Sequence, residues 1–354
     1  SITPDSLLIS ERAHLTLPFH RELDALGEAG RGSSKLGTTK RGIGPTYMDK
    51  AQRCGLRLVD ALDLQAFTDT LWERLTHTNE ALAAAGFERM DLEAVGKETL
   101  AAVERLLPHM ANTIAVLHGA MEDGKKVLFE GAQGTFLDLD FGTYPFVTSS
   151  NTTAGGACTG SGVPPNRIDE VIGVCKAYTT RVGTGPFPTQ DEGFSDYLHA
   201  KGREFGATTG RERRCGWLDL VLLRQATMVN GLTSLAVTNL DGLDEQEVIQ
   251  VCTHYELDGK TLDLPPARVV DFARVVPQYE SLPGWKEDLS GVSHWADLPS
   301  PALNYLEMLE RFLRVPVAVV GVGPDREQTL LHPDVPLGLT LTGEPEGAKK
   351  TFLA

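Results

Sequence analysis

The sequence has few cysteines, and they form no pattern. Five cysteines are scattered along 354 residues, and no two of them make a C-x-x-C pair. Disulfide frameworks and structural zinc sites use closely and regularly spaced cysteines. We therefore expect reduced thiols in a cytoplasmic protein, and neither a zinc site nor a disulfide framework. The five are Cys54, Cys158, Cys175, Cys215 and Cys252.

The sequence also lacks long apolar runs and an excess of positive charge. No run is long enough to span a bilayer, and no secretory signal is visible. Acidic residues outnumber basic ones, 48 to 33, for a net charge of −15. This balance argues against nucleic acid or a membrane surface as a partner. The chain begins at Ser1 and soon enters the strand-like run Leu7–Ile9, so we expect a fragment or a processed form.

The phosphate-binding signature G-x-x-x-x-G-K-[ST] is absent as well. Its absence weakens the hypothesis of a regulatory GTPase switch. The sequence instead has apolar runs that end in polar glycine turns. The run Val127–Phe129 predicts a buried strand, which leads into E-G-A-Q-G-T at 130–135 and the hydroxyl-rich stretch Val147–Thr153. Glycines let a backbone approach a ligand, so we favour a site for a polar, phosphorylated ligand over a polar surface loop.

Three later apolar runs follow the same pattern. Val171–Tyr178, Leu235–Thr238 and Val315–Val320 each read as a strand that ends in a turn. An aspartate just past a strand, such as Asp241, can accept two hydrogen bonds from the edge of guanine. The repeated pattern predicts an α/β fold with a central, largely parallel sheet and one ligand-lined edge. We expect a single domain over 1–354, with a helical subregion at 56–125 and irregular structure over 252–290.

Two basic stretches stand out in this acidic chain. Residues 31–47 combine glycines, hydroxyls and basic side chains and could wrap an anion, although a flexible linker remains an alternative. Arg211, Arg213 and Arg214 fall within four positions. Arginine forks match carboxylates and phosphates, whereas the alternative is a solvated run of charge.

Taken together, these stretches resemble the adenylosuccinate synthetase family over essentially the whole chain. The resemblance implies a P-loop-NTPase-like synthetase fold without its N-terminal strand and phosphate loop. It also implies a carbon–nitrogen ligase that joins IMP and L-aspartate with GTP hydrolysis, acts as a homodimer and uses Mg²⁺. The motifs are G-T-T-K-R-G-I-G-P at 37–45, E-G-A-Q-G-T at 130–135, G-T-Y-P-F-V-T-S-S-N-T-T-A-G-G at 142–156, R-V-G-T-G-P-F-P-T at 181–189, F-G-A-T-T-G-R at 205–211, P-G-W at 283–285 and G-P-D-R at 323–326.

The resemblance also assigns ligands to positions of this chain. It implies that Arg53 reaches the IMP of the partner subunit. The implied IMP contacts are Thr39, Arg53, Gln133, Thr148 and Arg211. The implied aspartate loop is Ala207, Thr208, Thr209, Gly210, Arg211, Glu212 and Arg213. The implied GTP contacts are Arg213, Asn239, Leu240, Asp241, Gly321, Val322 and Gly323.

The chain departs from the family pattern in two ways. The G-D-E-G-K-G-K and H-N-A-G-H-T motifs, which supply the family's catalytic aspartate and histidine, are absent from these residues. We therefore expect no catalytic residue and no metal ligand in this chain, and a fragment that is inactive alone; the alternative is a non-catalytic, nucleotide-binding paralogue. In addition, Asn239 replaces a usual lysine, Gly321-Val322 a usual Ser-Thr, and Glu212 a common arginine.

Overall fold

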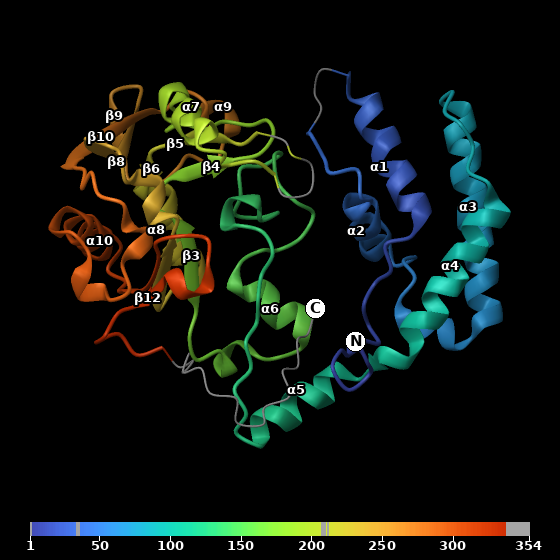
Figure 1. Cartoon of the computed structure of the whole chain (residues 1–354). Helices are drawn as coiled ribbons and strands as arrows, with labels where there is room; N and C mark the ends of the chain where they lie inside the picture. Colours follow the sequence, from blue (N-terminus) through green and yellow to red (C-terminus); the bar gives the residue numbers. More distant parts are fainter. Residues whose placement is uncertain (1, 33–35, 207–209, 211, 338–354) are drawn as a thin grey trace.

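A computed structural model describes residues 2–32, 36–206, 210 and 212–337. A helical N-terminal part, α1 to α4, lies beside a larger α/β part (Figure 1). The helices are α1 Pro18–Gly30, α2 Ile43–Gln52, α3 Leu64–Ala84, α4 Leu92–Leu106, α5 Thr113–Glu122, α6 Ala154–Ser161, α7 Glu192–Ala200, α8 Leu220–Asn230, α9 Val269–Phe272 and α10 Ser300–Leu313. The strands are β1 Ile9–Ser10, β2 Met110–Ala111, β3 Ile172–Lys176, β4 Thr179–Arg181, β5 Arg214–Gly216, β6 Leu218–Asp219, β7 Ser234–Thr238, β8 Val248–Leu257, β9 Lys260–Leu262, β10 Val276–Pro283, β11 Val317–Gly321 and β12 Thr329–Leu331.

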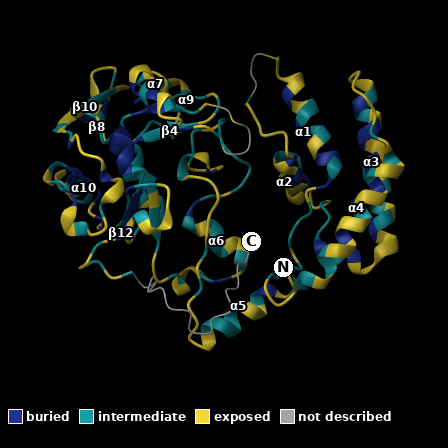
Figure 2. Cartoon of the chain, viewed as in Figure 1, coloured by how far each residue is buried: buried dark blue, intermediate teal, exposed yellow. Residues whose placement is uncertain are grey.

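The N-terminal helices bury apolar stripes at helical spacing. Leu71 and Leu75 of α3 are fully buried and share a core with Val103 of α4. Side chains cap the starts of α3, α4 and α5: Asp63 accepts a hydrogen bond from Ala66 N, and Asp91 and Asn112 act in the same way at α4 and α5. Figure 2 shows that the residues facing away from these contacts are mostly exposed.

The main sheet has the strand order β12-β11-β7-β3. β7 pairs in parallel with both β3 and β11, and β12 adds an antiparallel edge. The runs that predicted these three parallel strands are therefore strands, and the sheet is largely parallel as expected. α10 packs against β11 and α8, and the largest core, which includes Tyr305 and Val317, fills the space between the elements.

For residues 252–290 the sequence predicts irregular structure with only short strand-like runs, and the structure is more regular than that. This region contributes to a second four-stranded sheet, in which β10 pairs antiparallel with β8, and β6 and β9 also pair with β8. β8 alternates apolar and polar residues, and Ile249, Val251 and Tyr255 are buried. This two-residue period is the ordinary signal of a half-buried strand, and polar residues such as Thr253 and His254 obscured it.

The predicted buried strand at Val127–Phe129 is also absent. The segment has no strand assignment, and Leu128 is 65% exposed. A short apolar run becomes a strand only where a neighbouring strand satisfies its backbone groups, and within the described residues none pairs with it. Separately, no helix in the described part of the chain is long and apolar enough to cross a membrane.

Candidate functional site

The carboxyl ends of three neighbouring parallel strands form one edge of the main sheet. Lys176 at the end of β3 is in register with Thr238 at the end of β7. A Cβ added to Gly321, at the end of β11, would lie 3.5 Å from Thr238 Cα and 3.9 Å from Asn239 N. The structure therefore brings the two segments that we predicted for GTP, 239–241 and 321–323, side by side. Such an edge is where α/β proteins place ligands.

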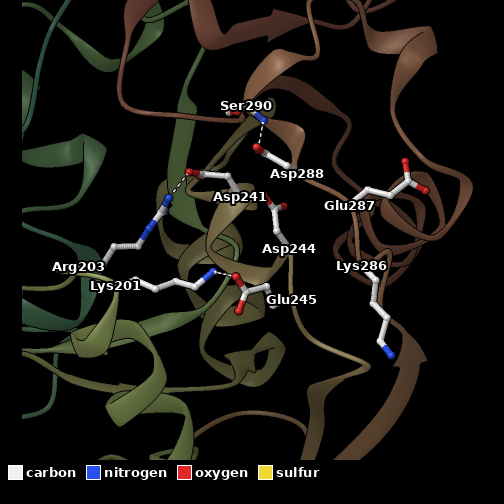
Figure 3. A pocket seen from close by; sticks show the side chains of 9 residues that line it. All are labelled: Lys201, Arg203, Asp241, Asp244, Glu245, Lys286, Glu287, Asp288 and Ser290. Carbon is white, nitrogen blue, oxygen red and sulfur yellow. Dashed lines mark hydrogen bonds and ion pairs between the residues drawn. The ribbon is translucent and has the colours of Figure 1, made fainter.

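A cavity of about 300 Å³ opens beside this edge. Asp241, buried in the short helical turn Leu240–Leu243, lies on its wall and forms an ion pair with Arg203 (Figure 3). The turn follows Asn239, whose backbone is left-handed at φ 59°. The lining residues are Lys201, Arg203, Asp241, Asp244, Glu245, Lys286, Glu287, Asp288 and Ser290.

The P-G-W motif supports one wall of this cavity. Trp285 donates its indole N–H to Asp244 Oδ1 at 2.9 Å, and Leu289 N donates to Asp244 Oδ2 at 3.1 Å. Burial, together with the charges of Asp241 and Asp288, raises the pKa of Asp244 to about 6. Gly284 comes so close to Gln246 that an added Cβ would lie 1.8 Å from its carbonyl oxygen. Only glycine fits there, which explains the glycine of the motif.

Glu204 is the hub of a second buried cluster, and the sequence reasoning missed it. Its carboxylate accepts hydrogen bonds from Lys176 Nζ at 2.6 Å, Tyr178 Oη at 2.6 Å and Arg213 Nη1 at 2.9 Å. Burial alone would raise the pKa of Glu204, but these three donors outweigh it and the net pKa is lowered. Arg213 N also donates to the Glu204 carbonyl oxygen at 2.9 Å. The cluster therefore holds Arg213, one of the predicted ligand residues, beside the end of β3, because Lys176 of β3 binds the same carboxylate.

The predicted aspartate loop falls partly outside the described residues. Ala207, Thr208, Thr209 and Arg211 lie outside them. Of the others, Gly210 is left-handed at φ 63°, and Glu212 is exposed and forms a bridge with Phe205. The structure thus describes how this loop is held at its base, through Phe205, Glu212 and Arg213.

Two arginines fix the turn after β4. Arg214 Nη2 donates to the carbonyl oxygens of Gly183 and Gly185 at 3.0 and 2.8 Å. Arg181 donates to Thr184 O at 3.2 Å and to Thr143 Oγ1 at 2.9 Å. Burial, with the charge of Arg214, lowers the pKa of Arg181 to about 10, so both arginines are charged at neutral pH. Arg181 thereby joins the R-V-G-T-G-P motif to the loop before Thr148.

Asp138 organises the hydroxyl-rich loop, and it too was missed. Its fully buried carboxylate accepts hydrogen bonds from four backbone N–H groups, at 2.6 to 3.2 Å. Burial opposes ionisation, but these bonds lower the pKa of Asp138 overall. Thr148, half-buried, is held through its N–H to Leu137 O at 2.8 Å, whereas Gln133 is exposed. The four donors belong to Asp140, Phe141, Thr152 and Thr153.

The glycine-rich segment before α2 and the first turn of α2 lie next to these two loops. Thr184 Oγ1 lies 3.5 Å from Leu36 O, and a Cβ on Gly44 would lie 3.5 Å from Ser149 Oγ. Its N–H groups are partly occupied, since Glu28 of α1 accepts from Leu36 N and Gly37 N. The segment thus reaches the α/β part with its own shape already fixed by α1.

Thr39 and Arg53, two of the predicted IMP contacts, are both exposed. Thr39 lies in the segment itself, and Arg53 ends α2 in a left-handed conformation at φ 66°. Asp49 holds α2 in place, because it pairs with Arg74 of α3 and accepts from His20 Nε2 of α1 at 3.1 Å. Arg53 is therefore displayed on a rigid helix end.

The described residues contain no group of three or more His, Cys, Asp or Glu side chains that could hold a metal ion. Three of the five acidic residues of the cavity, Asp241, Asp244 and Glu245, are instead engaged with Arg203, Trp285 and Lys201. The part of the chain described therefore does not fit a Mg²⁺ site.

Comparison with known proteins places this geometry in a family. The family described as adenylosuccinate synthetase matches residues 1–330. An adenylosuccinate synthetase of Desulfatibacillum aliphaticivorans is 49% identical over 335 residues, which cover 94% of this chain and 78% of that protein. One from Synechococcus sp. (strain CC9311) is 51% identical over 330 residues, which cover 93% and 76%.

Solved structures agree with these relatives. A fully ligated adenylosuccinate synthetase from Plasmodium falciparum matches with a TM-score of 0.88 and 35% identity, over 93% of this chain and 78% of that chain. The succinoaminodeoxyadenylate synthetase of cyanophage S-2L, bound to dGMP and dATP, matches with a TM-score of 0.53 and 18% identity, over 92% and 69%. The second likeness concerns the fold alone.

Proposed function

The chain belongs to the adenylosuccinate synthetase family, and we propose which of its residues serve each substrate of that ligase. Members of the family join IMP and L-aspartate with GTP hydrolysis, in the synthesis of AMP. The γ-phosphoryl group of GTP moves to O6 of IMP, and the aspartate amine then displaces the phosphate at C6. A transfer of this kind depends mostly on positioning and on charge stabilisation.

The guanine base of GTP binds at Asp241. A carboxylate has two oxygens, and guanine offers two donors on one edge, the N1–H and the exocyclic amine. The observation that carries this assignment is the position of Asp241 on the wall of the cavity, directly after β7 and next to the loop after β11. Asn239, Leu240 and residues 321–323 form the remaining base contacts, and Arg213 serves the GTP side.

IMP binds where the glycine-rich segment, the hydroxyl-rich loop and the turn after β4 meet. The hydrogen bond from Thr184 to Leu36 O, and the position of Gly44 next to Ser149, support this location. Arg53 lies on an exposed helix end, which suits an arginine that reaches the IMP of the partner subunit in a homodimer. The IMP contacts are Thr39, Arg53, Gln133, Thr148 and Arg211.

L-Aspartate binds to residues 207–213, which follow the Glu204 cluster. Arginines suit its two carboxylates because the planar guanidinium donates two parallel hydrogen bonds. Glu204 supports this role by holding Arg213 in a fixed position. The family uses Mg²⁺ to neutralise charge on the transferred phosphoryl group. The described residues do not fit a Mg²⁺ site, so the roles proposed for them are substrate binding and positioning.

The assignment of Asp241 is tested with the Asp241→Asn variant. An amide presents one acceptor where the carboxylate presents two, so GTP binding should weaken at least tenfold, while IMP binding stays unchanged. Isothermal titration with each nucleotide measures both. The matched control is Asp263→Asn, which alters an exposed aspartate that pairs with Arg224. Equal GTP affinity in both variants would remove Asp241 from the base site.

A further inference from the structure

The carboxylate proposed to read guanine already has a partner inside the protein. Arg203 Nη2 forms an ion pair with Asp241 Oδ2, and the two side chains are 31% and 6% exposed. Figure 3 shows Arg203 extending across the cavity toward Asp241. The neighbouring cations are engaged elsewhere, since Lys201 pairs with Glu245 at 2.7 Å and Lys286 pairs with Glu247. Arg203 is thus the cation that neutralises Asp241.

The backbone holds Arg203 in this position. Gly202 and Glu204, on either side, are both left-handed, with φ of 70° and 62°. A left-handed conformation is unfavourable for glutamate, and the three side-chain donors on Glu204 fix it there. The side chains of Arg203 and Glu204 therefore serve two different clusters. Arg203 has a fixed point of attachment and a flexible side chain that can leave Asp241.

The two-donor edge of guanine would bond to both Asp241 oxygens, and Arg203 already donates to one of them. We propose that Arg203 is a specificity-determining residue that competes with the guanine base for Asp241 and must leave it when GTP binds. This inference rests on the proposed function of Asp241. Adenine does not present two N–H donors on one edge for a carboxylate, so its binding does not require the exchange.

The competition has a measurable consequence. If GTP binds only to molecules in which Arg203 has left Asp241, its apparent affinity is reduced in proportion to the fraction of molecules in that state. Removal of the guanidinium should therefore tighten GTP binding, by about five- to thirtyfold if the ion pair holds most molecules in the closed state. ATP binding should change less than twofold. A role in packing alone would weaken both nucleotides, and a role as a direct GTP ligand would weaken GTP.

The test compares variants by isothermal titration with GTP and with ATP, at 0.15 M salt. Arg203→Met should tighten GTP selectively, and Arg203→Lys, which keeps the cation, should stay within about threefold of the unchanged chain. Lys201→Met is the matched control, because it removes a cation from the same cavity without freeing Asp241; it should not tighten GTP. In the Asp241→Asn background, Arg203→Met should not tighten GTP binding.

The outcomes separate the two proposals. If Asp241→Asn weakens GTP binding but Arg203→Met also weakens it, then Asp241 reads the base and the competition is refuted. If Asp241→Asn leaves GTP binding unchanged, the base assignment fails and the competition fails with it. Selective tightening by Arg203→Met, absent from the Asp241→Asn background, supports both.

Discussion

Replacement of Glu204 by glutamine should destabilise the protein strongly for a single-atom change. The Glu204 side chain is 2% exposed and accepts hydrogen bonds from Lys176, Tyr178 and Arg213. Glutamine keeps one acceptor oxygen but loses the charge, so two cations lose their counter-ion. Removing one partner of a buried ion pair costs about 3–5 kcal/mol. Because Lys176 and Arg213 are 25% and 29% exposed, solvent screening should reduce the loss below this range, to about 2–3 kcal/mol.

Urea unfolding followed by tryptophan fluorescence measures this loss. With a slope of about 3 kcal/mol per molar urea, the midpoint should fall by about 0.7–1 M at pH 7.5. The control is Glu245→Gln, since Glu245 pairs with Lys201 but is 67% exposed, and an exposed pair contributes less than about 1 kcal/mol. A Glu204→Gln midpoint equal to that of the control would refute the role of this cluster.

The pH dependence gives a second test of the same cluster. The net pKa of Glu204 is lowered from its ordinary value of 4.5 in the folded protein. A carboxylate of this kind contributes stability above its unfolded pKa and loses it as the pH falls through the folded pKa. The difference between the unchanged chain and Glu204→Gln should therefore be full at neutral pH and shrink progressively below pH 4.5. A difference that stays constant to pH 3 would contradict the ionised state of Glu204.

Two further predictions follow from the proposed sites. Arg53→Leu should weaken IMP binding far more than GTP binding, whereas Arg105→Leu, an exposed control on α4 of the same helical part, should weaken neither; equal losses for both nucleotides would contradict the cross-subunit role. Residues 1–354 alone, assayed by absorbance with GTP, IMP, aspartate and Mg²⁺, should turn over at least 10²–10⁴-fold below the usual 1–10³ s⁻¹, because they lack the family's G-D-E-G-K-G-K base. Turnover within the usual range would show that other residues perform the proton transfer.

The sheet could be predicted from the sequence where each strand carries its own signal. Val315–Val320 and Leu235–Thr238 are apolar runs with glycine or asparagine turns behind them, and both lie in the main sheet. Val127–Phe129 looks much the same in the sequence and yet pairs with nothing in the described part of the chain. A strand needs a neighbouring strand to pair with, as well as an apolar pattern. The residues of an apolar run do not specify which segment, if any, pairs with it.

The candidate site could also be predicted only in part from the sequence. The predicted GTP segments could be placed together because the carboxyl ends of parallel strands meet at one edge. The residues that organise the site, Asp138 and Glu204, gave no such signal. Each is a single acidic residue, and at least part of its importance comes from donors outside its own segment: Lys176 is 28 positions from Glu204, and Thr152 is 14 positions from Asp138.

The Glu204 carboxylate suggests how a chain of net charge −15 can hold anionic substrates. The proposed ligand residues include arginines, and buried arginines need counter-ions or carbonyl oxygens to remain in place. Glu204 provides the counter-ion for Arg213, and the turn at Gly183–Gly185 provides carbonyl oxygens for Arg214. Acidic groups therefore position the cations from behind, and the exposed sides of the guanidinium groups remain available for carboxylates and phosphates. The acidity of the chain is therefore compatible with proposed anion sites, because a carboxylate such as Glu204 can hold an arginine in place from inside the protein.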